Sequence, residues 1–151
     1  MANTQAMCTS FKGELLVGHH NFGTGVVRAA TTADSFKAAL YLASATINAS
    51  TTAYTATGEV TGTGYTAGGV AVTNATAPAT NGTTAYWTPS ASITYTTVTL
   101  TTAFDCVLIY NSTQSNKAVS VHTFGSQTVT AGTFTLTMPT NDSSTGLIRL
   151  A

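Results

Sequence analysis

The chain has 151 residues, of which 43% are hydrophobic and only 7% charged, and its five basic and five acidic residues cancel. This length suits one domain with its own core, and the apolar content excludes a chain that is disordered for want of hydrophobic side chains. A neutral chain without clustered Lys and Arg has no electrostatic attraction for nucleic acid or anionic membrane, so we expect neither as a partner.

The N-terminal stretch predicts the only helix in the chain. Met7, Phe11 and Leu15 recur every four residues, which places them on one face of a helix, with Asn3 or Thr4 as its cap. We therefore expect residues 1–25 to form a short N-terminal helix or arm. Two interpretations stay open for its apolar stripe, which either docks on a partner protein or packs on the chain's own sandwich.

From Ser35 onward the pattern predicts strand after strand. Apolar and polar residues alternate in short runs separated by turn residues, which is typical of β-structure. The predicted fold is all-β, an antiparallel β-sandwich or jelly-roll of about eight strands that occupies residues 26–151. The predicted strands are Phe36–Leu42, Val70–Thr73, Thr84–Thr88, Ile93–Leu100, Ala103–Tyr110, Lys117–Phe124, Thr128–Thr130, Thr133–Met138 and Leu147–Leu150.

A long segment rich in small residues, Ala43–Gly69, separates the first two of these strands. We expect it to be an extended connection with at most a short helical turn near Thr57–Val60. A connection of this length in a small domain is usually functional or packed against the rest of the domain.

No residue pattern predicts catalysis, a metal site or a cofactor. His19 and His20 are adjacent, so their side chains diverge and chelate one ion poorly, and we expect an exposed loop there. His122 lies on a predicted strand, facing away from Val119 and Val121. The carboxylates are scattered and no Gly-x-Ser-x-Gly motif occurs, so we do not expect an enzyme.

The two cysteines are too few for a disulfide framework. Cys106 follows Asp105 within an apolar run, which predicts a buried free thiol. For Asp105 we expect a strand-end position or an ion pair with Arg28, Lys37 or Arg149. The sequence leaves the state of Cys8 open.

The aromatic residues divide between two interpretations. Tyr and Trp are favoured in protein interfaces, but they also fill the ends of a sandwich core. Tyr54 and Tyr65 lie in the long connection, and we take them, with Met7, Phe11 and Leu15, as candidate partner contacts. Trp87 is expected in the core.

Four stretches together resemble a family of small structural proteins encoded by tailed bacteriophages. They are Thr4–Leu16, Phe36–Gly69, Val107–Val119 and Phe134–Ala151. The resemblance implies a component of the virion that is assembled in the host cytoplasm, and it carries no catalytic residues. No basic segment followed by an apolar core occurs at the N-terminus, so we expect no secretory leader.

These observations predict a capsid decoration or cement protein that binds other virion proteins, such as the major capsid protein, and forms a homo-oligomer. A charge-poor, threonine-rich surface favours association over life as a free monomer. One alternative places the chain in the neck or tail, as an adaptor or fibre-base subunit. Another is a receptor-binding module in which Tyr54, Tyr65 or Trp87 stacks on a glycan.

Overall fold

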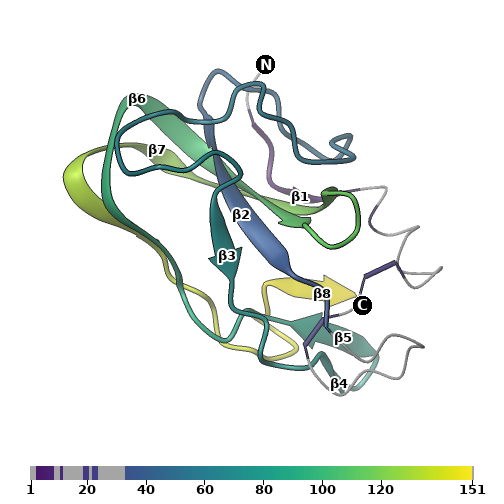
Figure 1. Cartoon of the computed structure of the whole chain (residues 1–151). Helices are drawn as coiled ribbons and strands as arrows, with labels where there is room; N and C mark the ends of the chain where they lie inside the picture. The colour runs from purple at the N-terminus through teal and green to yellow at the C-terminus, as the bar shows by residue number, and fades with distance from the viewer. Residues whose placement is uncertain (1–2, 9–10, 12–18, 21, 24–32, 151) are drawn as a thin grey trace.

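The computed structural model describes part of the N-terminal segment and nearly all of the chain after it, namely residues 3–8, 11, 19–20, 22–23 and 33–150. All the secondary-structure elements whose bounds the structure describes are β-strands (Figure 1). The strands are β1 (Ala6–Met7), β2 (Phe36–Leu42), β3 (Val70–Val72), β4 (Ala79–Asn81), β5 (Thr84–Trp87), β6 (Ile93–Asn111), β7 (Lys117–Leu136) and β8 (Ile148–Leu150).

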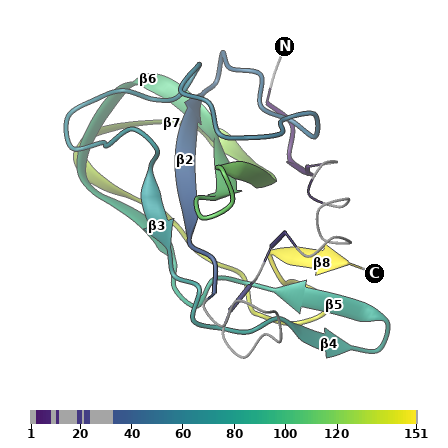
Figure 2. The same ribbon diagram turned by 45° about the vertical axis from the view of Figure 1, so that its right-hand side comes forward.

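The strands form two antiparallel sheets, which confirms the predicted all-β class and is consistent with a β-sandwich. The larger sheet has five strands in the order β1-β7-β6-β2-β3, and the smaller has three in the order β4-β5-β8. Figure 2 shows the small sheet below the large one, with β4 and β5 extending to one side.

The strands β6 and β7 form one long hairpin that folds back on itself. The sequence predicts five separate strands here, and this prediction is wrong, because pairing runs from Ile93–Leu136 to Asn111–Lys117. The ladder shifts register at five places, and Thr97 and Ala131 have positive φ angles of 53° and 46°. Such bulges bend a hairpin without ending it.

The distance between two phenylalanine rings on β7 shows how strongly the hairpin bends. Phe124 and Phe134 would lie about 33 Å apart on a straight strand. Their ring centroids are 5.2 Å apart, and Phe104 packs edge-on against Phe134 at 5.0 Å. The hairpin therefore has a near limb beside its turn (residues 104–111 and 117–124) and a far limb (residues 93–100 and 129–136), which face each other.

The aromatic core continues from this cluster toward the small sheet. Trp87 is 2% exposed, as the sequence predicts, and its indole N–H donates to the carbonyl of Thr76. Phe22 packs between Phe36 and Trp87, with both ring centroids 4.8 Å away. The core thus joins the large sheet to the small one.

The N-terminal segment differs from its prediction. Ala6 and Met7 form a strand that pairs with Val121 and Ser120 of β7, so no helix begins near Asn3. The remainder of the predicted helix, residues 12–18 with Leu15 and Gly18, lies outside the described residues. Of the predicted apolar stripe, Met7 therefore lies on a strand, while the described residue Phe11 is helical.

The side chain of Asn3 anchors this segment rather than capping a helix. Its amide nitrogen donates to the carbonyl of Leu42 and to Asp105, and its oxygen accepts the N–H of Ile47. Asp105 therefore accepts a hydrogen bond from an amide. Arg28, one of the three cations named as its possible partners, lies outside the described residues. The described N-terminal residues are part of the domain and not a separate arm.

The connection between β2 and β3 packs across the large sheet, as an extended segment. Three isolated bridges hold it, joining Tyr41 to Glu59, Ala53 to Lys117 and Thr63 to Thr99. It ends at Gly69, whose φ is 71°, and a Cβ there would overlap the carbonyl oxygen of Ala38 on β2.

Substitution of Gly69 by alanine tests this close approach. Gly82 provides a matched control, because its φ is also positive (58°) but no atom lies within 4 Å of a Cβ built there. We expect Gly82→Ala to lower the free energy of unfolding by about 1–2 kcal/mol through backbone strain alone. Gly69→Ala should cost clearly more in urea denaturation, and equal costs would contradict the packing of the connection on β2.

Candidate functional site

The five candidate contact residues lie in different surroundings. Phe11 is fully buried against His20 and Phe22, so it packs within its own chain. Met7 is half-buried on β1. Leu15 lies outside the described residues. Tyr54 and Tyr65 are half-buried and come together around one carboxylate.

That carboxylate belongs to Glu59, which is 6% exposed. Its two oxygens accept the hydroxyls of Tyr54 at 2.6 Å and Tyr65 at 2.7 Å, and one also accepts the N–H of Gly68 at 2.7 Å. A buried carboxylate is stable only when such donors replace its water. The three donors meet that requirement.

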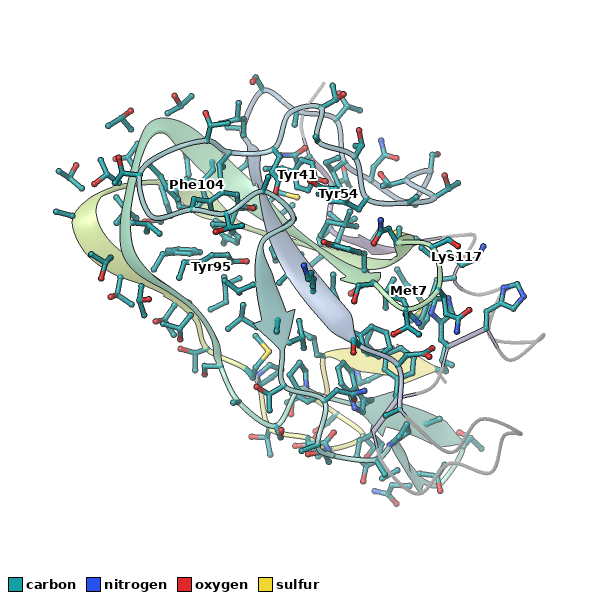
Figure 3. All side chains as sticks on the ribbon, viewed as in Figure 1. Met7, Tyr41, Tyr54, Tyr95, Phe104 and Lys117 are labelled. Carbon is teal, nitrogen blue, oxygen red and sulfur yellow. The ribbon has the colours of Figure 1, made fainter. Side chains whose placement is uncertain are left out.

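Five of the six tyrosines surround this carboxylate and direct their hydroxyls inward. Tyr41 donates to the carbonyl of Thr55, Tyr95 to that of Ala38, and Tyr110 to that of Gly68. The ring of Tyr54 stacks on Tyr110 at 4.9 Å (Figure 3 shows Tyr41, Tyr54 and Tyr95). This tyrosine cluster therefore ties the connection to the sheet.

Burial and the charge of Glu59 hold these phenols in their neutral form. The pKa of Tyr54 is raised to about 12, first by burial and then by its hydrogen bond to Glu59. Burial also raises the pKa values of Tyr41, Tyr65, Tyr95 and Tyr110, with Glu59 adding to each. Ionising a phenol beside a buried carboxylate would place two negative charges together.

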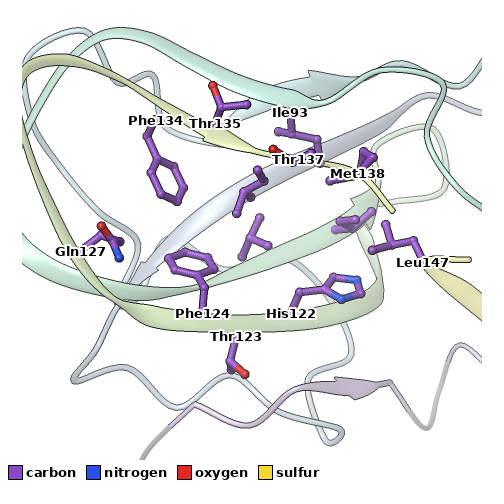
Figure 4. Close-up of a pocket in the computed structure, with 13 residues that line it drawn as sticks. Ile93, His122, Thr123, Phe124, Gln127, Phe134, Thr135, Thr137, Met138 and Leu147 are labelled. Atoms are coloured by element: carbon purple, nitrogen blue, oxygen red, sulfur yellow. The ribbon is translucent and has the colours of Figure 1, made fainter. Parts of the chain in front are cut away.

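A second feature is an apolar groove between the two limbs of the hairpin (Figure 4). It has a volume of about 280 Å³ and opens to solvent. Its apolar lining comes from both limbs of β6 and β7 and from the segment that leads to β8, with Ile93, Val107, Ile109, Phe124, Phe134, Leu136, Met138 and Leu147.

His122 is the titratable residue in this groove. Cross-strand pairing with Val107 places it on the groove side of β7, and its Nε2 lies 2.9 Å from the hydroxyl of Ser120. Burial lowers its pKa to about 4. The imidazole is therefore neutral at pH 7, and the groove presents an uncharged surface.

A third feature is the outer surface of the far limb and its bend. The sequence has no charged residue between Glu59 and Asp105 or between Lys117 and Asp142, and these two stretches build the far limb. Thr94 and Thr135 form a cross-strand pair there, with their hydroxyls 3.5 Å apart. We call the exposed threonines of this surface the threonine face: Thr94, Thr96, Thr97, Thr101, Thr102, Thr128, Thr130, Thr133 and Thr135.

The histidine and cysteine side chains considered as possible ligands or nucleophiles lie in different surroundings. His19 is exposed as predicted, but His20 is buried, with its Nδ1 3.2 Å from the amide nitrogen of Asn111. Cys106 is buried and free, as predicted, and burial raises its pKa to about 12. Cys8 is also buried and takes part in no disulfide.

Comparisons with known proteins identify no relative of this chain. The chain matches no protein-family model, no curated protein and no solved structure. Within the described residues, no group of three or more His, Cys, Asp or Glu side chains could hold a metal ion. The same part of the chain contains no helix long and apolar enough to cross a membrane.

Sequence reasoning identified Tyr54 and Tyr65 but missed Glu59, which organises them. Its signal was weak, because a single carboxylate in a polar segment usually faces solvent. The groove was missed entirely, because it depends on the fold-back that brings Phe124 and Phe134 together.

Replacing Glu59 by glutamine tests the tyrosine cluster. The amide has one acceptor oxygen for three donors, so we expect a loss of about 1–3 kcal/mol in the free energy of unfolding. The pKa of Tyr54 should fall below about 12 but stay raised, since the bond to Glu59 and its negative charge are gone while burial, the larger cause, remains. Phenolate absorbance against pH measures this, and Tyr54→Phe assigns the signal. An unchanged titration curve would contradict the assigned role of Glu59.

The lowered pKa of His122 predicts a stability loss in acid. Below pH 6.5 the unfolded chain gains a proton on this histidine, whereas the folded chain does not until about pH 4. The free energy of unfolding should therefore fall by up to about 3 kcal/mol as the pH drops through this window. Urea unfolding at several pH values measures it. His122→Gln should remove this part of the slope and His19→Gln, at an exposed position, should not.

Proposed function

We propose that the protein is a structural component of a tailed-phage particle, and that within the particle it is a decoration protein that binds and stabilises the capsid shell. Its sequence resembles small virion proteins of such phages over most of its length. Its partners are then the major capsid protein and further copies of itself, and it resides in the virion.

The observation that carries this proposal is the threonine face. Burying charged groups in an interface costs several kcal/mol for each ion unless each is paired well. Threonine hydroxyls cost far less to dehydrate, and the methyl group beside each one adds apolar contact. An uncharged surface of β-branched side chains on a curved sheet therefore suits a large, permanent contact with a neighbouring subunit.

A role in the neck or tail would use the same kind of surface, and the copy number distinguishes the two. Hundreds of copies in each particle support the shell, whereas a dozen or fewer support the neck or tail. Of the three aromatic residues named for the receptor-binding alternative, Trp87 is 2% exposed and offers no face to a sugar, while Tyr54 and Tyr65 are half-buried.

Particles depleted of this protein provide the test. We expect them to release their contents at a lower temperature than complete particles, and to recover when wild-type protein is added back. The double variant Thr96→Glu/Thr133→Glu places two charges on the threonine face and should bind at least tenfold more weakly.

Thr83→Glu is the matched control, because Thr83 is exposed in the turn between β4 and β5, away from the threonine face. It should restore stability as the wild type does. Depleted particles as stable as complete ones would rule out the cement role.

A further inference from the structure

The turn between β4 and β5 contains Asn81 and Gly82, the only asparagine–glycine pair in the chain. Asn81 ends β4 and pairs with Thr84 of β5, so Gly82 and Thr83 form a two-residue loop. The φ of Gly82 is 58°, which fits a hairpin turn with glycine at its first central position. Asn81, Gly82 and Thr83 are all exposed, on a hairpin that extends to one side of the molecule (Figure 2).

The surroundings of Gly82 leave its backbone nitrogen accessible. Within the described part of the chain, the N–H of Gly82 has no hydrogen-bond acceptor. No atom lies within 4 Å of a Cβ built at this position, and glycine has no side chain of its own to shield the nitrogen. A backbone nitrogen that loses its proton attacks the side-chain amide carbon of an asparagine directly before it. That attack meets little steric hindrance here.

The backbone at Asn81 also moves at low cost. The attack requires Asn81 to leave the extended conformation of β4. This strand has only three residues, Ala79–Asn81, it lies at the edge of the small sheet, and Asn81 is in its last pair. Such terminal pairs open with little free energy. The bond from the Asn81 amide to the Oγ of Ser143, at 3.1 Å, is exposed, so water replaces it readily.

We propose that Asn81 is a site of spontaneous deamidation in the folded protein. The nitrogen of Gly82 loses its proton and bonds to Cγ of Asn81, and the side-chain nitrogen takes up a proton and leaves as ammonia. The product is a succinimide ring. The oxygen of a water molecule then bonds to one of the two ring carbonyl carbons, the bond from that carbon to the ring nitrogen breaks, and the nitrogen regains a proton.

The point at which the ring opens decides the product. Opening at Cγ gives aspartate, and opening at the main-chain carbonyl gives isoaspartate. The whole sequence consumes water and releases ammonia, and it needs no oxidant or reductant. It does not depend on the proposed role in a phage particle.

The two products affect the hairpin differently. Aspartate keeps the backbone, and its carboxylate accepts the hydroxyl of Ser143. The carbonyl of Ser143 already accepts the guanidinium of Arg149 at 3.4 Å, so a cation lies beside the new negative charge. Isoaspartate adds a carbon to the backbone, which disrupts the pairing of residue 81 with Thr84. Deamidation therefore adds a charge to a hairpin that has none, and through isoaspartate it loosens the turn.

Peptide mass spectrometry of the full-length protein, kept folded at mildly alkaline pH, tests this. Asn81 should convert to aspartate and isoaspartate, and faster as the pH rises, because base removes the proton of Gly82. Asn116 is the internal control, because it is exposed but is followed by Lys117, and it should stay intact. In Gly82→Ala the new Cβ shields the nitrogen, and conversion should slow about tenfold. Backbone strain in this variant loosens the turn and acts in the opposite direction, so it does not mimic the slowing.

The same measurement in urea provides the outcome that overturns the proposal. If Asn81 converts in urea but stays intact in the folded protein, the folded turn does not permit the reaction. Equal conversion of Asn81 and Asn116, or no slowing in Gly82→Ala, contradicts the role assigned to Gly82. Asn81→Asp reproduces the first product and should keep the urea midpoint of the wild type. Aged protein rich in isoaspartate should unfold at a lower urea concentration, and an unchanged midpoint would contradict the predicted loosening of the turn.

Discussion

The fold-back of the β6–β7 hairpin is the constraint on which the rest of the structure depends. The far limb alternates buried and exposed residues and so has one apolar face, which a single hairpin cannot bury in water unaided. Bending the hairpin brings this face against the near limb, so that Phe104, Phe124 and Phe134 meet in one cluster. The bend also produces the groove, and it turns the threonines of the far limb outward.

The tyrosine cluster holds the long connection between β2 and β3 in place. The connection between β2 and β3 has few large apolar side chains and cannot be held by packing alone. Glu59 compensates with three short hydrogen bonds, all of them from residues of the connection itself. The connection is tied to the sheet by Tyr41 on β2 and Tyr110 on β6, whose hydroxyls donate to the carbonyls of Thr55 and Gly68. Burial makes such bonds costly to break.

The low charge of the chain has a structural counterpart in this arrangement. The charge-free stretches form the far limb and the edge of β7, so the least charged parts of the sequence are also those that present surface to a neighbour. The groove and the threonine face lie on the inner and outer sides of the same limb. The neutral His122 adds no charge to this limb at pH 7.

The sequence by itself determined the all-β class, the position of β2, the core placement of Trp87 and the burial of Cys106, because alternation and apolar runs are local signals. Only the tertiary structure decided that five predicted strands are one bent hairpin, since bulges keep pairing intact where side-chain patterns suggest breaks. The same holds for Met7, which the sequence pattern places on a helix but which pairs with Ser120 on β7 as part of a strand. Glu59 and the groove depend on residues far apart in the chain, and no local pattern records which distant donors will surround a carboxylate or which rings will meet.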